Sequence, residues 1–180
     1  MKRDWVITKV DGKISAVGTD FGSAAKVLEA VACLPKDTVG EVTVGKIDTQ
    51  ELFALSETLR WEDLRPFGSK FRLEVWKALF DLTHDGEKPR LYSYSDFASA
   101  MGKGPGVRAV AHAIGLNPIN VIVPCHLIIP KESLDRLQAI QDENGLFSWK
   151  ALYIVDSKVD YGEYALGPDL KRDLIRAHLG

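Results

Sequence analysis

The sequence predicts an α/β fold, with a small N-terminal α/β domain followed by a winged-helix-like, mostly helical domain. Near the N-terminus, two runs of strand-forming residues flank Asp11-Gly12, a strong signal for a tight hairpin turn. Further on, two short helical patterns flank the glycine-rich segment 102–106, as in a helix-turn-helix. Between these regions, Pro66 and Gly68 break the pattern and indicate a boundary. The expected parts are domains over 1–64 and 65–157 and a C-terminal tail with one helix over 158–180.

The first part alternates between strand and helix patterns. Residues 5–10 and 13–17 are the expected hairpin strands, and residues 41–47 alternate like a third strand. Residues 21–33 carry apolar side chains at helical spacing, with Ser23 as a candidate N-cap, and a second helix is expected over 49–61. This region shows no clear chemistry of its own.

The second part is predicted to be mostly helical. A short strand over 90–93 precedes the helix-turn-helix, and a strand leads to Cys125. We expect a polar loop over 131–144 and burial of the last helix through Leu170, Leu174 and Ile175. The expected helices are 71–82, 94–101, 107–115, 145–156 and one from Pro168 onward, where proline suits the first turn.

Composition bounds the function. The chain is 46% apolar and 27% charged with a net charge of -2, so a polyanion would have to be bound by a local basic patch. Cys33 and Cys125 lie far apart, no CxxC pair occurs, and the histidines lack metal-ligand spacing, so no metal is expected. The N-terminus opens no signal peptide, and no apolar run approaches about 18 residues. These features predict a reducing, cytoplasmic setting without a membrane partner.

The most informative segment is the apolar run 121–129, which Pro124-Cys125-His126 interrupts. Proline cannot donate to a strand ladder, so the backbone must leave regular pairing there. A buried thiol is inert unless its thiolate is stabilised, and His126 is the candidate for that task. Neighbouring side chains of an extended chain point apart, so the pair would need a local bend or a bridging water. A structural cysteine beside a satisfied core histidine is the alternative.

Asp156 is a candidate third member of this group. It follows Leu146, Trp149 and Tyr153 on one helical face, and a carboxylate near a helix C-terminus is disfavoured by the helix dipole. A buried carboxylate there would seek a donor such as His126. The acid would then orient the imidazole, and the imidazole would take the thiol proton. Alternatively, Asp156 simply ends its helix in water.

The second helix of the helix-turn-helix carries Arg108 among small apolar residues. Small side chains let a helix approach a DNA groove closely, and arginine can contact bases or fill a gap in a stack. Tyr94, at the start of the first helix, is a candidate phosphate contact. An ordinary exposed arginine and a half-buried packing tyrosine are the alternatives.

Together these residues resemble the O6-alkylguanine-DNA alkyltransferases, also called methylated-DNA–protein-cysteine methyltransferases. The resemblance runs from about Pro66 to Asp156, and its order and spacing make it specific. The matching pieces are Pro66-Phe67, Val75-Trp76-Lys77-Ala78-Leu79, Ser93-Tyr94, Arg108-Ala109-Val110, Asn117-Pro118, Pro124-Cys125-His126 and Gly145-Leu146.

The resemblance implies direct reversal of DNA alkylation. The partner would be double-stranded DNA containing O6-alkylguanine, bound through the minor groove with the damaged base flipped out. Cys125 would take the alkyl group irreversibly, so one protein repairs one lesion, without a cofactor and as a monomer. O4-alkylthymine is a further candidate substrate.

The resemblance also implies roles for single residues. His126 would generate the thiolate through a water, Asp156 would orient it, and Asn117 would tie the hinge beside the cysteine. Arg108 would replace the flipped base and Tyr94 would push on the phosphate. The other expected DNA contacts are Ala109 and Lys103. The residues expected around the flipped base are Tyr94, Met101, Val123, Pro124, Asn144 and Gly145.

The sequence departs from the family pattern at several positions. Leu127 stands where the family has arginine, Leu116 where it has glycine, and Asp156 where it has glutamate. Residues 142–145 replace a Tyr-Ser-Gly-Gly-like stretch and add two carboxylates, which should weaken DNA affinity. We expect the cysteine chemistry to be kept, with altered substrate range or affinity.

Three other functions fit part of the pattern. A lesion-binding alkyltransferase-like protein would hold the alkylated base without transfer, although Cys125 argues against it. A hydrolase with a Cys-His-Asp triad would leave Arg108 without purpose. A winged-helix DNA-binding protein with a structural cysteine would make the Pro-Cys-His match accidental.

Overall fold

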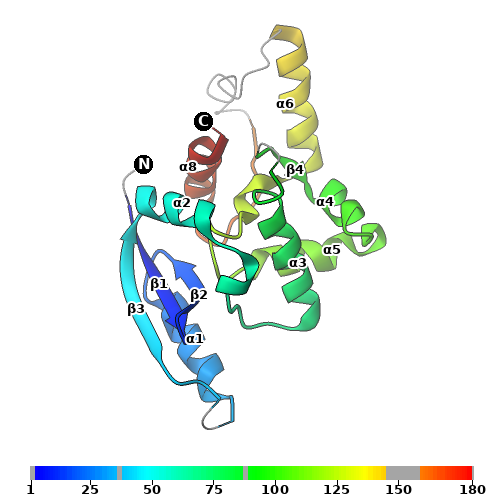
Figure 1. Ribbon diagram of the computed structural model, residues 1–180. Coiled ribbons are helices and arrows are strands. Elements are labelled where there is room, and N and C mark those ends of the chain that lie inside the picture. Colours follow the sequence, from blue (N-terminus) through cyan, green and yellow to red (C-terminus); the bar gives the residue numbers. More distant parts are fainter. Residues whose placement is uncertain (1–2, 36–37, 87–88, 145–158, 180) are drawn as a thin grey trace. The chain divides into compact units, whose positions relative to one another are not determined.

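The computed structural model describes residues 3–35, 38–86, 89–144 and 159–179 (Figure 1). The chain divides into two compact units, residues 1–85 with 116–125 and residues 86–115 with 126–180. The chain therefore leaves the second unit after residue 115, returns to the first, and re-enters the second at His126. The sequence-based division after residues 64 and 157 stays a prediction.

An antiparallel sheet forms the base of the first unit. Its strands are β1 (Asp4–Val10), β2 (Lys13–Gly18) and β3 (Val42–Asp48), in the order β2-β1-β3. The turn between β1 and β2 places Asp11 at φ 50° and Gly12 at φ 79°, both left-handed, as a tight hairpin turn requires. The expected hairpin and third strand are confirmed.

Three α-helices complete this unit. Helix α1 (Gly22–Ala32) lies against β1 and β2 (Figure 1), and α2 (Thr49–Thr58) follows β3 with a capping box between Asp48 and Glu51. Helix α3 (Lys70–Asp81) follows a short 3₁₀ turn, η1 (Trp61–Asp63). The prediction that Ser23 caps α1 is wrong, because its hydroxyl donates back to the Asp20 carbonyl at 3.0 Å. The Asp20 carboxylate instead accepts from the N–H of Gly22, the first residue of the helix, at 2.8 Å.

The predicted strand leading to Cys125 is also wrong. Residues 117–124 run through turns and an isolated bridge, with Val121 at φ 72°. Asn117 and Asn120 use their side chains to bond nearby backbone groups, which competes with a regular ladder. Regular pairing begins only at β5 (Ile128–Ile129), parallel to β4 (Tyr92–Ser93) in the second unit.

The helix-turn-helix of the second unit is confirmed. Helix α4 (Tyr94–Ala100) and helix α5 (Val107–Gly115) pack on one another around the 3₁₀ turn η2 (Gly104–Gly106). Gly102, at φ 69°, ends α4 in a Schellman motif, in which Lys103 N–H donates to the Ala98 carbonyl at 2.8 Å. Glycine is suited to this position because it adopts positive φ at no steric cost.

Among the described residues, two further helices contribute to the core of the second unit. The predicted polar loop over 131–144 is wrong, because these residues form helix α6 (Lys131–Asn144), which buries Leu134 and Leu137 at helical spacing. The last helix, α8 (Pro168–Leu179), is confirmed with its expected buried residues. The predicted helix over 145–156 lies outside the described residues. The core comprises Leu91, Leu127, Ile129, Leu134, Leu137, Val159, Tyr161 and Ile175.

Candidate active site and nucleic-acid interface

Cys125 is held in the first unit by an asparagine. Its side chain is only 5% exposed, and Asn117 Nδ2 donates a hydrogen bond to Cys125 Sγ at 3.0 Å and to the Val123 carbonyl at 2.8 Å. The other end of the same amide, Asn117 Oδ1, accepts from Ile119 N–H at 3.0 Å. A donor directed at sulfur stabilises negative charge there, so this contact favours the thiolate over the thiol. The predicted pairing of Asn117 with the cysteine segment has a defined geometry here.

The sheet of the first unit anchors this loop, which we call the cysteine loop (residues 117–125). Val17 of β2 donates its backbone N–H to the Pro118 carbonyl at 2.9 Å, and its carbonyl accepts from Asn120 Nδ2 at 2.8 Å. Val121 keeps a left-handed backbone in spite of its branched side chain, at an expected cost of roughly 1–3 kcal/mol. The surrounding hydrogen bonds offset this strain. The N-terminal α/β layer, which showed no chemistry in sequence, therefore shapes the backbone around the nucleophile.

His126 lies in the second unit and is fully buried. Its Nε2 shares a hydrogen bond of 2.9 Å with Nδ1 of His178 on α8, and the two ring centroids lie 5.1 Å apart. Its own Nδ1 is buried without a hydrogen-bond partner among the described residues. Burial lowers the pKa of His126 well below the ordinary 6.5, and the neighbouring His178 and Lys171 lower it further. The imidazole is therefore neutral at pH 7.

A buried lysine lies on the same helix as His178. Lys171 is fully buried, with its ammonium 5.8 Å from the centroid of the Tyr94 ring and 3.5 Å from the Glu163 carbonyl. An ammonium over an aromatic face is attracted by the ring quadrupole. The half-buried Tyr94 thus has a cationic neighbour from α8 that the sequence did not suggest.

The expected third member of the relay lies outside the described part of the chain. Asp156 and Gly145 fall in the segment 145–158, and Asn144 is described only as the last residue of α6. The partner that the structure gives to His126 is instead His178, 52 residues along the chain. Sequence reasoning missed His178 because no local motif contains it. The available signal was the amphipathic pattern of α8, which places residues 171 and 178 two turns apart.

The remaining predicted residues fall into two groups. Val123 and Pro124 are buried in the cysteine loop of the first unit. In the second unit, Arg108 and Ala109 are exposed on the outer side of α5, opposite the buried Val110. The partly exposed residues near them in the chain are Met101 and Lys103. The helix-turn-helix therefore presents an open, small-residue surface with positively charged side chains, as a nucleic-acid interface requires.

The unusual Leu127 has a structural explanation. It follows His126 in the 3₁₀ turn η3 (Cys125–Leu127) and is fully buried in the core of the second unit. A leucine suits this position because a guanidinium would have to be desolvated there. The departure from the family pattern thus contributes to packing.

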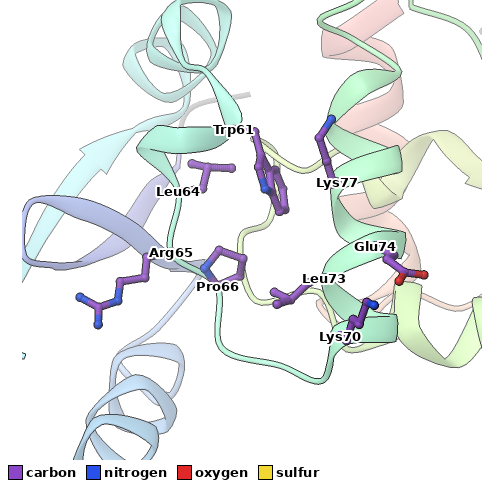
Figure 2. A pocket seen from close by; sticks show the side chains of 8 residues that line it. All are labelled: Trp61, Leu64, Arg65, Pro66, Lys70, Leu73, Glu74 and Lys77. Atoms are coloured by element: carbon purple, nitrogen blue, oxygen red, sulfur yellow. The ribbon is translucent and has the colours of Figure 1, made fainter. Parts of the chain in front are cut away.

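A hollow in the first unit lies away from this chemistry. Its volume is about 400 Å³, and Figure 2 shows Trp61 and Pro66 facing Leu73 across it. Its lining residues are Trp61, Leu64, Arg65, Pro66, Lys70, Leu73, Glu74 and Lys77, none of which was a predicted site residue. The Arg65 guanidinium points away from it (Figure 2). This guanidinium pairs with Asp11 at 2.6 Å.

The described residues contain neither a metal-binding cluster nor a helix that could cross a membrane. No group of three or more histidine, cysteine, aspartate or glutamate side chains there is arranged to hold a metal ion. Among the helices that the structure describes, none has both the length and the apolar character to cross a membrane.

Known proteins match the part of the chain that contains both the helix-turn-helix and the cysteine loop. Residues 70–139 match the family model of the DNA-binding domain of 6-O-methylguanine DNA methyltransferase. These residues are similar to that domain. The matched segment contains Tyr94, Arg108, Asn117, Cys125 and His126. The family resemblance seen in the sequence is therefore confirmed over residues 70–139.

Curated relatives match the same part of the chain. A probable methylated-DNA–protein-cysteine methyltransferase of Acanthamoeba polyphaga mimivirus is 41% identical over 71 residues, 39% of this chain and 45% of the relative. The inducible methylated-DNA–protein-cysteine methyltransferase of Bacillus subtilis is 45% identical over 64 residues, 36% of this chain and 34% of the relative. The chain thus spans half or less of the length of these relatives.

Solved structures extend the likeness to the whole fold. The chain is 20% identical to Mycobacterium tuberculosis OGT, in a crystal structure of a complex with DNA, with a TM-score of 0.55 over 98% of this chain and 91% of that one. A crystal structure of the O6-methylguanine methyltransferase of the same organism gives 18% identity and a TM-score of 0.53, over 99% and 93% of the two chains. The α/β fold outside the methyltransferase domain is shared with these proteins.

Proposed function

We propose that this protein repairs alkylated DNA by transferring the alkyl group of O6-alkylguanine to Cys125. The observation that carries the proposal is the buried thiol that accepts a hydrogen bond from Asn117 inside a methyltransferase domain. The names of the curated relatives describe transfer from methylated DNA to a protein cysteine. The acceptor is a side chain of the protein, so each chain acts once and needs no cofactor.

The proposed transfer is a displacement at the alkyl carbon. The Cys125 thiol gives its proton, through a water, to the neutral His126, and Asn117 stabilises the resulting thiolate. The Sγ–carbon bond forms as the carbon–O6 bond breaks, and the electron pair of that bond stays with guanine. The imidazolium then returns the proton to the leaving guanine. The final products are an S-alkylcysteine and an unmodified guanine.

DNA recognition is assigned to the helix-turn-helix. Arg108 and Ala109 on the outer side of α5, with Lys103 in the preceding turn, would face the duplex. Arg108 would fill the gap left by the flipped base, and Tyr94 would press on the adjacent phosphate. The net charge of -2 means that phosphate binding depends on these few side chains, so affinity should fall steeply with salt.

The rest of the predicted pocket is part of the same proposal. The backbone of the cysteine loop around Val123 and Pro124 would read the guanine edge, and Met101 would line the pocket from the end of α4. Asn144 and Gly145 are proposed to lie near the flipped base as well. O4-alkylthymine is proposed as a second substrate, and a monomer in the cytoplasm as the working form.

Intact-mass spectrometry after incubation with duplex DNA carrying one O6-methylguanine tests the function. We expect a gain of one methyl group per chain, located on the peptide that contains Cys125. Cys125→Ser should show no gain, whereas the exposed Cys33 can be replaced by serine without effect. Binding of the duplex without a mass gain would point to a lesion-binding protein, and repeated turnover would point to a hydrolase; either result would overturn the proposal.

A further inference from the structure

We infer that His178, on the C-terminal helix, is the positioning residue for His126 in the proposed reaction. The inference rests on the proposed alkyl transfer and gives His178 the role that the sequence had suggested for Asp156. His178 would fix the ring orientation and the tautomer of His126 without touching the alkyl group itself.

The geometry of the pair supports this role. His126 Nε2 and His178 Nδ1 are 2.9 Å apart, an ordinary hydrogen-bond distance, and the imidazole of His126 is fully buried. A buried imidazole with one such bond is held in one orientation. Among the described residues, no other side chain makes a hydrogen bond to this ring.

The hydrogen-bond pattern favours one tautomer of His126. A neutral imidazole carries a proton on one nitrogen only. If Nε2 accepted from His178, the proton would sit on Nδ1 as a buried donor without a described partner, which is a rare and costly arrangement. If Nε2 donates to His178, Nδ1 keeps a lone pair. The second arrangement leaves a basic nitrogen available to take the thiol proton.

Lys171 adds an electrostatic bias to the same ring. It is fully buried on α8, and its positive charge disfavours protonation of His126. His178 lowers the pKa of His126 in the same direction, because two hydrogen-bonded imidazoles do not readily carry a proton charge each. The charged or titratable groups that act on His126 among the described residues are therefore both supplied by the C-terminal helix. The result is an imidazole that is neutral at pH 7 and can therefore accept a proton.

The C-terminal helix is anchored well enough to position a side chain. Pro168 starts α8 at its first turn, and Leu170, Leu174 and Ile175 are buried at 5%, 0% and 1% exposure. Lys171 and His178 lie two turns apart on the helix, so they share one side with the buried Leu174 and Ile175. Burial of several apolar side chains on this face fixes the helix, and with it His178.

The test combines a kinetic and a spectroscopic measurement on the full chain. Single-turnover methyl transfer would be measured against pH for wild type, His178→Phe and His178→Asn, with Ala177→Ser as an exposed control on the same helix. Phenylalanine keeps the ring but removes the hydrogen bond, so we expect the rate to fall about 10- to 100-fold, within the roughly 10⁴-fold upper limit of a general base. Asparagine keeps a polar atom near the position of Nδ1, so it should restore most of the rate. Duplex binding should be the same in all four proteins.

Nitrogen-15 NMR of the wild-type side chains reads the tautomer directly and does not depend on transfer. We expect a protonated Nε2 and an unprotonated Nδ1 for His126. Two results would overturn the role of His178 and leave the proposed function intact. One is full-rate methyl transfer by both the wild type and His178→Phe. The other is a protonated Nδ1 in His126. A wild type that transfers no methyl would overturn both. If His178→Phe fails to fold, the rate of His178→Asn and the wild-type tautomer still decide the question.

Discussion

Cys125 and His126 are neighbours in the chain, yet the two units hold them in different ways. The cysteine belongs to a loop that closes on itself, because Asn117 binds the sulfur and two backbone groups within eight residues. The histidine depends on His178, which lies 52 residues further along. The comparison teaches that the nucleophile is positioned by local sequence and its base by tertiary packing. Substitutions that disturb the cysteine and substitutions that disturb the histidine should therefore have different effects on stability and on the rate of transfer.

The largest expected effect comes from restoring the family's arginine at Leu127. This side chain is fully buried in the core of the second unit, so Leu127→Arg would desolvate a guanidinium there. We expect a loss of about 3–5 kcal/mol in the free energy of unfolding, measured by urea titration. The matched control Leu127→Met keeps the volume and should cost less than about 1.5 kcal/mol. An arginine variant as stable as wild type would contradict the packing explanation.

Asn117→Ala tests how the cysteine loop positions Cys125. The change removes the donor to Cys125 Sγ and leaves the Val123 carbonyl and Ile119 N–H without the amide, at a cost of about 1–3 kcal/mol for each unsatisfied group. We expect the single-turnover rate to fall by about 10-fold or more for each 1.4 kcal/mol of lost thiolate stabilisation. Asn120→Ala is the control, because it loosens the loop through Val17 without removing the sulfur contact. Equal rate losses in the two variants would show that loop shape, and not the sulfur contact, controls reactivity.

Arg108→Ala tests the DNA interface. This interface involves neither the contact of Asn117 with Cys125 nor the contact of His178 with His126. Arg108 is exposed on α5, so its removal should leave stability unchanged within about 0.5 kcal/mol. We expect weaker duplex binding and, if Arg108 neutralises one phosphate, a salt dependence reduced by about one counterion. Transfer from the free alkylated base should stay at the wild-type rate. A loss of that reaction would place Arg108 in the chemistry and contradict the assignment.

The smallest effect is a pH dependence of stability. The pKa of His126 is lowered on folding by burial first and by His178 and Lys171 next, so the unfolded chain binds the proton more tightly. Stability is therefore fully present above the unfolded pKa near 6.5 and falls as the pH drops below it toward the lowered folded value. Thermal unfolding between pH 8 and pH 5 measures this slope, which His126→Gln should reduce. An unchanged slope in that variant would place the effect on other groups.

Local patterns predicted much of the fold. The Asp11-Gly12 hairpin, the helix-turn-helix and the last helix with its buried residues all follow from short-range spacing, and all are confirmed. The sequence pattern predicts a loop where the structure has helix α6, because polar residues dominate this segment and its burial rests on Leu134 and Leu137. Residues 131–144 do have apolar side chains at helical spacing, but these are too few to stand out among the polar ones.

The candidate site divides in the same way. The Asn-Pro and Pro-Cys-His segments lie close in sequence, and the hydrogen bond between Asn117 and Cys125 could be expected from the resemblance. The contact between His126 and His178 could not, because it depends on how α8 packs against the core of the second unit. The left-handed Val121 was equally hidden, since valine disfavours that backbone conformation and only its surroundings impose it.

The path of the chain limits how this protein can be divided into fragments. The peptide bond between Cys125 and His126 joins the two units, and the cysteine loop is hydrogen-bonded to β2 of the N-terminal sheet. A fragment that began after the sheet would retain the whole matched segment, residues 70–139, but would lose the backbone partners of its own cysteine loop. The N-terminal layer therefore cannot be exchanged as an independent module. In recombination or in protein engineering, it has to be inherited together with the cysteine that it shapes.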